Sequence, residues 1–397
     1  MVAALVLGSV AKSMGYGADA AWLQPVDFVG QMFLRLLKMI IVPLVFASVI
    51  TGVSSIDVNK LGALGGKTLL YYTTSTAAAV VLGLFAVNLV KPGDGVSIET
   101  DYVPPVEPTG FAEVFLNIVP TNPFASLAAE YHLLGVISFG IFLAVAISSV
   151  GEDAKPLRRF FVSLEAVMMW IVDVVMKLAP VGIFALLLTL VVETGAGIVG
   201  DLAKYMATVV GALGIHAVVT LPLLVMLVGR ISPLKLVRAL SPALLTAFST
   251  ASSAATLPVT MDSLENRAGV DPTVSGFVLP LGATVNMDGT ALYEAVAAIF
   301  IAQAFGIDLT LGAQVLVFVT ATLAAIGAAG VPSAGLVTMI IVLEAVGLPI
   351  EGIGLLVAVD RILDMTRTTV NVWGDACGAA IIASRDGMLN REILDAP

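Results

Sequence analysis

The sequence contains few charged residues, a single cysteine and two histidines among its 397 residues. Only 12% of the residues are Asp, Glu, Lys or Arg, whereas soluble domains carry about 25%. Hydrophobic residues make up 58% of the chain, and the mean hydropathy is +1.02. A soluble core of this size does not need such a composition, so we predict an all-α, polytopic protein of the cell membrane.

The scarcity of cysteine, histidine and positive charge argues against several kinds of function. Cys377 stands alone, so we expect neither a disulfide scaffold nor a cysteine-rich metal site, and the residue itself should be buried by packing. Neither histidine lies near the polar motifs of the sequence, which argues against zinc or iron. His216 is expected to be a structural histidine with satisfied hydrogen bonds. The formal net charge of −10 argues against a nucleic-acid partner.

The first twenty residues allow two interpretations. Residues 1–10 are apolar, and Ala18-Asp19-Ala20 resembles a signal-peptidase site. No positively charged segment precedes the apolar run, however, as a signal peptide requires. We therefore favour part of a first transmembrane helix over a cleaved signal peptide.

Long apolar segments predict the membrane-spanning helices. They cover residues 26–56, 68–90, 111–150, 157–192 and 202–228, and prolines in the third segment are expected to break it. The loops that carry most of the Lys and Arg alternate with loops that carry mostly acid. By the positive-inside rule, the basic side and the C-terminus are cytoplasmic.

Two segments in the second half of the chain predict re-entrant hairpins. Residues 233–267 begin and end with charge around a Ser/Thr-rich centre, and neither arm is long enough to cross about 30 Å. Residues 309–348 have a glycine-rich centre and are expected to enter from the opposite side. Each hairpin is followed by a helix with polar groups at mid-depth. This is the pattern of an inverted repeat, at whose interface secondary transporters place a substrate site.

The segment of residues 360–378 places more polar groups on one helix face than lipid tolerates. Helical spacing brings six polar side chains within an arc of roughly 100°. They are Asp360, Asp364, Arg367, Thr368, Asn371 and Asp375. Each charged side chain at membrane depth costs at least ~2.5–3.5 kcal/mol. This face is therefore predicted to lie against a polar interior or a ligand.

Arg367 and Asp364 form the most informative pair on this face. The arginine fork matches a carboxylate, and Asp364, about one turn away, could hold an ammonium group. The pair suits a zwitterion with an additional carboxylate. Alternatively, the pair and its neighbours Asp360 and Arg361 merely neutralise one another, and for these two neighbours we expect a supporting role.

The Gly-, Asn- and Asp-containing stretch of residues 282–290 predicts a cation site. An unwound turn there frees backbone carbonyls at membrane depth. Together with nearby side-chain oxygens, these carbonyls make the all-oxygen environment that hard cations prefer. The side chains are those of Asn286, Asp288, Asn371 and Asp375. Hydroxyl groups near residue 72 either bond their own helix or add further ligands.

Glu294 follows this stretch by a few residues. Burial penalises the charged form of a carboxyl group, so Glu294 could take up and release a proton. Alternatively, it is the fixed partner of an arginine or lysine. We favour proton exchange.

Four motifs give the sequence a specific resemblance. They are Ser252-Ser253 with Thr256-Leu257-Pro258, LPLGATVNMDGTALYE at residues 279–294, AIGAAGVPSAG at residues 325–335, and the polar segment of residues 364–378. With these motifs the chain resembles the dicarboxylate/amino acid:cation symporter family, which includes the animal excitatory amino-acid transporters and prokaryotic homologues. The resemblance covers nearly the whole chain from residue 26.

The resemblance implies a glutamate-transporter-like elevator fold. Eight transmembrane helices and two re-entrant helical hairpins would form each subunit of a homotrimer in the lipid bilayer. Residues 1–65 (helices 1 and 2) and 93–195 (helices 4 and 5) would form the scaffold. Residues 66–92 (helix 3) and 196–397 (helix 6 to helix 8 with both hairpins) would form the moving transport domain.

By matching position, the resemblance also implies binding residues. Arg367 would bind the substrate's side-chain carboxylate, and Asp364 its amino group. The implied substrate-binding set is Ser252, Ser253, Thr290, Val331, Gly335, Asp364, Arg367, Thr368 and Asn371. Three sodium sites are implied: the first with Gly282, Asn286, Asn371 and Asp375, the second with Thr284, Met287 and the backbone of Ala325, Ile326 and Ala328, and the third with Tyr72, Ser75, Thr76, Asn286 and Asp288.

Three positions narrow the substrate that the resemblance implies. Neutral amino-acid members replace the arginine found here as Arg367, C4-dicarboxylate members lack the aspartate found as Asp364, and some proton-coupled bacterial members lack that found as Asp375. Sodium-coupled symport of glutamate or aspartate is therefore implied, with Na+ as the coupled ion and no organic cofactor. A C4-dicarboxylate or neutral amino-acid symporter is the alternative. Glu294 matches the proton-carrying glutamate of animal members, so H+ coupling and K+ countertransport are further hypotheses.

The sequence departs from the family pattern at two positions, and two other protein classes fit it less well. Ala254 replaces the third serine of the family's first-hairpin triplet, and the bulky Trp373 is expected to alter packing at a sodium site. An intramembrane enzyme is disfavoured, because no histidine stands beside the tip serines in the sequence and the paired aspartates share one helix. A channel would not concentrate its substrate.

Overall fold

The computed structural model of the protein describes residues 2–17, 20–54, 64–95, 119–128, 133–194, 198–328, 330, 333–357 and 359–395. Helices account for most of these residues, and the β structure within them is an isolated bridge between Val270 and Leu389. Five helical stretches in the described part are long and apolar enough to cross a membrane. The prediction of an all-helical chain with several apolar, membrane-length helices is confirmed.

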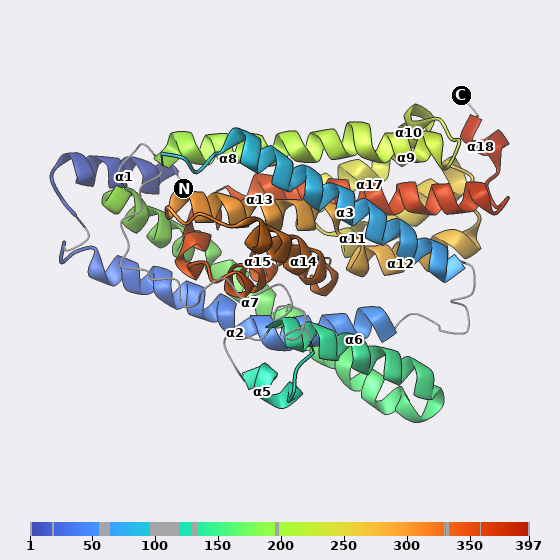
Figure 1. The fold of residues 1–397 in the computed structure, drawn as a ribbon, viewed down its shortest axis with the longest axis horizontal. Helices are drawn as coiled ribbons and strands as arrows, with labels where there is room; N and C mark the ends of the chain where they lie inside the picture. Colours follow the sequence, from blue (N-terminus) through green and yellow to red (C-terminus); the bar gives the residue numbers. More distant parts are fainter. Residues whose placement is uncertain are drawn as a thin grey trace.

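One bundle is built from the first half of the chain. It contains α1 (Val2–Ser13), α2 (Gln24–Ser54), α6 (Leu133–Val150) and α7 (Lys155–Thr194), with α5 (Pro123–Ala128) and the turn η2 (Gly151–Ala154) beside them. Glycine permits close approach of α2 and α7, because a Cβ atom at Gly30 would lie 2.8 Å from Leu186. The segment predicted over residues 111–150 is broken near its prolines as expected, since residues 119–122 are not helical and α5 begins at Pro123. Figure 1 shows α2 and α6 along one side of the molecule.

Helix α3 (Gly66–Val90) leaves this bundle and packs against α13 (Asp288–Ala304). Gly83 permits this contact, because a Cβ atom there would lie 3.0 Å from the carbonyl oxygen of Leu292. The other face of α3 exposes large apolar side chains, namely Leu70, Phe85 and Leu89. The most apolar part of Pro272–Ala304 is 94% buried, against 33% for α3. Protein therefore encloses α13, whereas α3 keeps a face for lipid.

A π-helical turn interrupts the next long helix. Helices α8 (Ile198–Ile215) and α9 (Leu221–Leu227) are joined by the π-helical turn η3 (His216–Thr220) without a break in the chain's helical path. The helix predicted over residues 202–228 is therefore present. Such turns widen the backbone locally and are frequent at functional sites.

The segment predicted as the first hairpin forms two helical arms. Helix α10 (Pro233–Thr250) ends at Ala251, which has a left-handed backbone with φ of 51°. Ser252 then starts α11 (Ser253–Asp262) by accepting a hydrogen bond from the backbone N–H of Ala255 at 3.1 Å. The π-helical turn η4 (Ser263–Arg267) completes the second arm. A left-handed residue followed by a serine cap thus reverses the chain.

The predicted interruption within residues 282–290 is also present. Helix α12 (Pro272–Val285) stops at Asn286, and α13 begins after Met287. Both intervening residues have non-helical backbone angles. Asp271 caps α12 by accepting from the N–H of Thr273 at 2.8 Å, and this bond lowers the pKa of the Asp271 carboxyl group by stabilising its charged form.

The second hairpin consists of α14 (Leu311–Gly327) and α15 (Ala334–Ala345). Ser333 precedes α15 with a left-handed φ of 62°. The predicted residue Val331 lies outside the described residues. The turn η5 (Ile350–Gly352) and α16 (Ile353–Val357) connect this hairpin to the last long helix.

Helix α17 (Asp360–Arg385) crosses the centre of the second half (Figure 1) and is followed by α18 (Arg391–Asp395). Ion pairs tie distant basic residues to this end of the chain. Lys67 pairs with Asp386, and the Nζ atom of Lys235 lies 2.8 Å from Asp395. The start of α3, the start of α10 and the C-terminal segment therefore lie at one end of the molecule.

Candidate functional site

The two hairpin tips meet beside the interruption between α12 and α13. The hydroxyl group of Ser252 donates to the carbonyl of Gly330 at 2.7 Å, and the N–H of Ala254 donates to the same oxygen at 3.1 Å. A Cβ atom at Gly330 would lie 2.8 Å from the carbonyl oxygen of Ala283. Segments separated by more than thirty residues in sequence thus converge on one point.

Arg367 lies under these tips and is buried, with 1% of its surface exposed. Its Nη1 atom donates to Asp360 at 2.9 Å, and its Nε atom donates to Asp364 at 3.1 Å. Its guanidinium carbon lies 4.3 Å from the ring centre of Tyr293. The Nη2 atom lies 2.9 Å from Asp364 but has no hydrogen bond among the described residues. The guanidinium group is therefore neutralised and still has N–H groups for a ligand.

The expected supporting role fits Asp360 but not Arg361. Asp360 pairs with Arg367, whereas Arg361 is exposed. The reason is the helical register: residues 360, 364 and 367 share a face, and residue 361 is rotated by about 100° from residue 360. Mutual neutralisation, the alternative considered above, is therefore real for Arg367 with its two aspartates.

The second hairpin contacts the ion cluster that Asp360, Asp364 and Arg367 form. The backbone N–H of Ser333 donates to Asp364 at 2.8 Å. A Cβ atom at Gly335 would lie 2.8 Å from the guanidinium carbon of Arg367. Glycine at position 335 therefore lets α15 approach Arg367 more closely than any other residue would.

A cavity of about 10 Å³ remains between the tips, α13 and α17. Its lining includes seven of the nine predicted substrate residues, namely Ser253, Thr290, Gly335, Asp364, Arg367, Thr368 and Asn371. Sequence reasoning missed Ala251 and Ala334 as lining residues, because small apolar residues give no signal. Ser252 turns towards Gly330 instead. This volume holds about one water molecule, so the site is closed and the hairpins must separate to admit a larger ligand.

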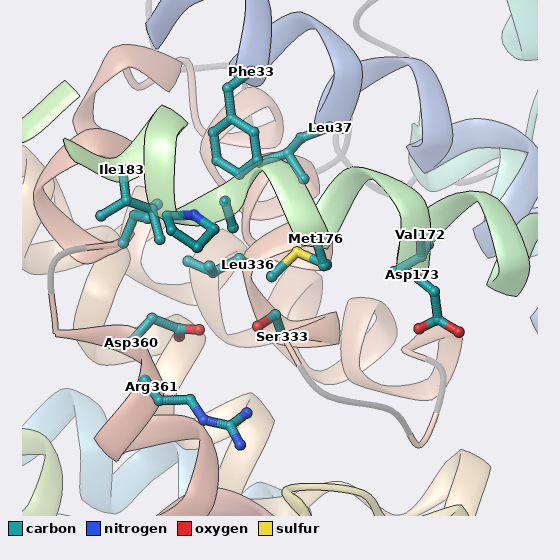
Figure 2. Close-up of a pocket in the computed structure, with 13 residues that line it drawn as sticks. Phe33, Leu37, Val172, Asp173, Met176, Ile183, Ser333, Leu336, Asp360 and Arg361 are labelled. Carbon is teal, nitrogen blue, oxygen red and sulfur yellow. The ribbon is translucent and has the colours of Figure 1, made fainter. Parts of the chain in front are cut away.

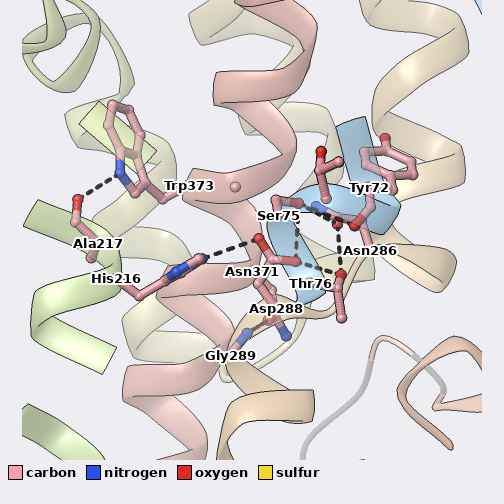
Figure 3. A network of polar contacts seen from close by, with 12 residues as sticks. Tyr72, Ser75, Thr76, His216, Ala217, Asn286, Asp288, Gly289, Asn371 and Trp373 are labelled. Carbon is pink, nitrogen blue, oxygen red and sulfur yellow. Dashed lines mark hydrogen bonds and ion pairs between the residues drawn. The ribbon is translucent and has the colours of Figure 1, made fainter. Parts of the chain in front are cut away.

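Beside this cavity, α3 and the interruption form a cluster of oxygen atoms (Figure 3). Thr76 donates to Oδ1 of Asp288 at 2.6 Å, and Ser75 lies 3.2 Å from the same atom. Both hydroxyl groups lie within 3.4 Å of Oδ1 of Asn286. Ligands of one hard cation at about 2.3–2.6 Å are spaced by roughly 3–4 Å. Three of the four oxygen–oxygen distances fall in this range, and the 2.6 Å hydrogen bond between Thr76 and Asp288 would have to lengthen to admit a cation such as Na+.

The first predicted sodium set adjoins this cluster. Nδ2 of Asn286 donates to Asp375 at 2.9 Å, and Oδ1 of Asn371 accepts from the backbone N–H of Gly289 at 2.7 Å. A Cβ atom at Gly282 would overlap the carboxylate of Asp375. The structure thus brings Gly282, Asn286 and Asp375 together.

The second predicted sodium set is only partly assembled. The hydroxyl group of Thr284 donates to Leu281 at 3.2 Å and faces Gly52 of α2. Met287 is buried and lines the small cavity. Helix α14 ends beyond Ala325, and helix ends leave carbonyl groups without helical partners. A cation here would use backbone oxygens, since the Thr284 side chain points elsewhere.

Two further residues behave differently from the sequence expectation. Tyr72 donates to the carbonyl of Val278 at 2.6 Å, so it borders the cluster of oxygen atoms from the side. The expectation that His216 lies apart from the polar motifs is wrong, because its Nε2 atom lies 3.2 Å from Oδ2 of Asp288. The two residues are 72 positions apart. Only the fold brings η3 next to the interruption, so no sequence spacing indicates this pair.

Comparison with known proteins identifies the family of the chain. A model of the sodium:dicarboxylate symporter family matches residues 1–385. The chain belongs to this family. It is 41% identical to an excitatory amino acid transporter of Caenorhabditis elegans, over 96% of this chain and 86% of that protein. It is 39% identical to excitatory amino acid transporter 3 of Mus musculus, over 96% and 84% of the two chains. It is 37% identical to the proton/sodium-glutamate symport protein of Geobacillus stearothermophilus, over 98% and 94%.

Glu294 of this symporter-family protein is fully buried on α13. Thr338 of α15 donates to its Oε1 atom, and its Oε2 atom has no hydrogen-bond partner among the described residues. A hydroxyl group thus contacts Glu294 where the alternative had expected an arginine or lysine. A buried carboxyl group with a free oxygen is suited to hold a proton.

A second cavity, of about 520 Å³, lies between the α2–α7 bundle and the second hairpin (Figure 2). Most of its lining is apolar, including Phe33 and Met176. It reaches Ser333 and Asp360, which contact the ion cluster of Arg367 from the other side. Because the polar groups converge on the cavity of about 10 Å³, we assign the candidate binding site to that cavity. The cavity of about 520 Å³ is the space next to it.

Proposed function

We propose that this protein is a sodium-coupled symporter of acidic amino acids. The observation that carries the proposal is the buried guanidinium group of Arg367, which lies beneath two hairpin tips and next to the oxygen cluster of Asp288. Membership of the sodium:dicarboxylate symporter family and the relatives named as glutamate symporters support the same function. Transport, and no catalysed reaction, is the proposed activity.

The side-chain carboxylate and the ammonium group of the substrate would replace contacts that the residues of the closed site make with one another. Arg367 has an N–H group at Nη2 for the side-chain carboxylate, and Asp364 would exchange the N–H of Ser333 for the substrate's ammonium group. Thr290, Thr368 and Asn371 would bind the remaining polar atoms. C4-dicarboxylates lack the ammonium group proposed to bind Asp364, and neutral amino acids lack the carboxylate proposed to bind Nη2 of Arg367, so each would leave one of these contacts unmade.

Sodium ions would bind in the all-oxygen clusters beside the substrate. The third predicted site has the strongest support, since the hydroxyl groups of Ser75 and Thr76 converge on Oδ1 of Asp288 in a buried cluster of oxygen atoms. Gly282, Asn286, Asn371 and Asp375 would form the first site. Backbone oxygens of residues 284–287 and 325–328 would form the second. Shared residues such as Asn371 would couple ion binding to substrate binding.

Glu294 would carry a coupled proton. Its burial and its free Oε2 atom favour the neutral form in the closed site, and opening of the Thr338 contact would allow exchange with water. Potassium countertransport, which the resemblance to animal transporters suggests, would then return the substrate-free transport domain.

The molecule would work as an elevator in a homotrimer at the cell membrane, with a cytoplasmic C-terminus. Eight transmembrane helices and two re-entrant hairpins would divide into a scaffold of residues 1–65 and 93–195 and a transport domain of residues 66–92 and 196–397. The cavity of about 520 Å³ between α2, α7 and the second hairpin supports this division. Ion pairs of Lys67 and Lys235 with C-terminal aspartates support one shared basic side.

Uptake into proteoliposomes tests the proposal. Labelled aspartate should accumulate above its external concentration when a sodium gradient is imposed, and accumulation should stop when choline replaces sodium. Succinate should compete poorly compared with unlabelled L-aspartate. Better uptake of succinate would favour a C4-dicarboxylate carrier, and sodium-independent equilibration would contradict symport.

A further inference from the structure

The two carboxylate oxygens of Asp288 contact different groups. Oδ1 accepts from Thr76 at 2.6 Å and lies 3.2 Å from the hydroxyl group of Ser75, both on α3. Oδ2 lies 3.2 Å from Nε2 of His216, on the opposite side (Figure 3). Both His216 and Asp288 have no exposed surface. One oxygen thus belongs to the cluster of oxygen atoms, and the other belongs to the imidazole ring.

The direction of the hydrogen bond follows from the chemistry of the pair. An ionised carboxylate only accepts hydrogen bonds, so Nε2 of His216 carries the proton. Nδ1 of His216 has no partner among the described residues. In the neutral ring Nδ1 is then an acceptor, which avoids a buried N–H without a partner. The imidazole ring therefore acts towards Asp288 as a donor.

Helix α17 limits the positions open to Oδ2. A Cβ atom at Gly374 would lie 3.2 Å from Oδ2 of Asp288, so the α17 backbone closes one side of this oxygen. The neighbouring Trp373 points away from the oxygen cluster, and its indole N–H donates to the carbonyl of Ala217 at 3.0 Å (Figure 3). Ala217 follows His216 in the π-helical turn. The helix that carries Asn371 and Asp375 thus also holds the backbone next to the imidazole ring.

We propose that His216 is a positioning residue for the sodium site at Asp288, and that Trp373 holds His216 in place. The imidazole N–H fixes Oδ2 and so directs Oδ1 towards Ser75, Thr76 and the ion. Groups that orient a metal-binding carboxylate in this way change metal affinity by about 10–100-fold when they are removed. This inference rests on the proposed third sodium site.

Two amides of different length separate positioning from simple packing. In His216→Gln the amide nitrogen reaches approximately as far as Nε2, whereas in His216→Asn it stops one methylene short. Both amides are polar and can be accommodated where an imidazole fits. Val218→Ala, in the same turn but 74% exposed, is the control.

The measurement is the sodium-induced rise in melting temperature of the purified protein without amino acid. A second measurement is the sodium concentration that gives half-maximal aspartate uptake. His216→Asn should raise the required sodium concentration about tenfold or more, and His216→Gln should stay within about threefold of the parent. Trp373→Phe, which keeps the aromatic ring but lacks the N–H, should give an intermediate increase. Val218→Ala should match the parent.

Equal sodium dependence in His216→Asn, His216→Gln and the parent would overturn the inference, even if all variants melt at lower temperature. If the parent protein itself shows neither stabilisation by sodium nor sodium-dependent uptake, the proposed function is contradicted instead. If His216→Asn does not fold, the sodium requirement of Trp373→Phe tests the inference, because this variant leaves the imidazole ring in place. An unchanged sodium requirement in Trp373→Phe then counts against the proposal.

Discussion

The hydroxyl group of Ser252 donates a 2.7 Å hydrogen bond to the carbonyl oxygen of Gly330, and this bond joins the tips of the two hairpins. The backbone N–H of Ala254 donates to the same carbonyl at 3.1 Å. Both donors belong to the first hairpin, and the acceptor belongs to the second. Either hairpin must therefore break both bonds before it can move away from the cavity of about 10 Å³.

Ser252→Ala should make the closed site open more often. One of the two bonds between the tips is lost, which corresponds to about 0.5–1.5 kcal/mol, or roughly a threefold to tenfold larger open fraction. A cysteine introduced at the cavity residue Ala334 reports opening by its rate of maleimide labelling. Cys377 is buried, so the background is low.

Ser249→Ala is the matched control for this experiment. Ser249 lies on the same hairpin but donates to Leu245 of its own helix at 2.8 Å. Its removal should leave the labelling rate of the Ala334→Cys protein unchanged. Equal rates for Ser252→Ala and Ser249→Ala would mean that the Ser252 bond does not restrain the tips.

Arg367→Cys should abolish uptake of acidic amino acids and admit neutral ones. The variant removes the group expected to bind the side-chain carboxylate and leaves Asp360 without its ion-pair partner. Truncating one member of a buried, hydrogen-bonded charge pair costs about 2–5 kcal/mol of binding, so a loss of at least about thirtyfold in aspartate uptake at low concentration is expected. Uptake of labelled aspartate and serine in proteoliposomes measures the change. Arg361→Cys, on the exposed side of the same helix, should retain aspartate uptake.

The local chain reversals could be predicted from the sequence because each depends on nearby residues. Ala251 and Ser252 reverse the first hairpin through a left-handed residue and a serine cap. Asn286 and Met287 lie between α12, which has Gly282 in its last turn, and α13, which begins at Asp288. The face of α17 with Arg367 followed from helical periodicity alone.

Contacts between distant segments could not be predicted in the same way. The pairing of His216 with Asp288 depends on how α8 and η3 pack against α13, and no spacing in the sequence encodes it. The supporting role predicted for Arg361 fails because adjacent helical residues point in directions about 100° apart, so Arg361 does not share the helix face of Asp360. The small volume of the cavity depends on close packing of Gly335 on Arg367. The resemblance implies Gly335 as a binding residue, but the sequence does not show how closely the two residues pack.

Glu294→Gln should preserve sodium-dependent aspartate binding but remove its dependence on pH. The amide keeps an oxygen that accepts from Thr338, so the contact between α13 and α15 survives. It cannot gain or lose a proton in the accessible range. Binding measured between pH 5 and pH 9 should vary in the parent and stay constant in the variant. A variant that keeps the parent's pH profile would exclude Glu294 as the proton carrier.

Met176→Trp should slow transport while leaving substrate binding intact. Met176 lines the cavity of about 520 Å³ between the α2–α7 bundle and the second hairpin. A larger side chain there fills space that the moving domain is expected to use, so it obstructs the movement without straining the packed core. Uptake should therefore fall, with aspartate affinity in detergent unchanged. Leu178→Trp, at a position that is 49% exposed, should transport normally. Normal uptake by Met176→Trp would argue against movement across this cavity.

Gly282→Ala should weaken sodium binding without unfolding α12. A Cβ atom at residue 282 would overlap the carboxylate of Asp375 and lie 2.7 Å from the hydroxyl group of Tyr72. The Asp375 side chain must then turn away from Asn286, which removes a carboxylate from the first sodium set. Gly276→Ala in the same helix has no atom within 4 Å of the added Cβ and tests the effect of alanine alone.

We expect Gly282→Ala to raise the sodium concentration for half-maximal aspartate uptake at least tenfold, whereas Gly276→Ala should leave it unchanged. Alanine is the better helix former by about 1 kcal/mol, so neither substitution should destabilise the helix through its backbone. The melting temperature in choline chloride checks this point, and its rise on adding sodium chloride measures ion binding directly. If both glycine variants bind sodium equally well, Asp375 does not take part in a sodium site.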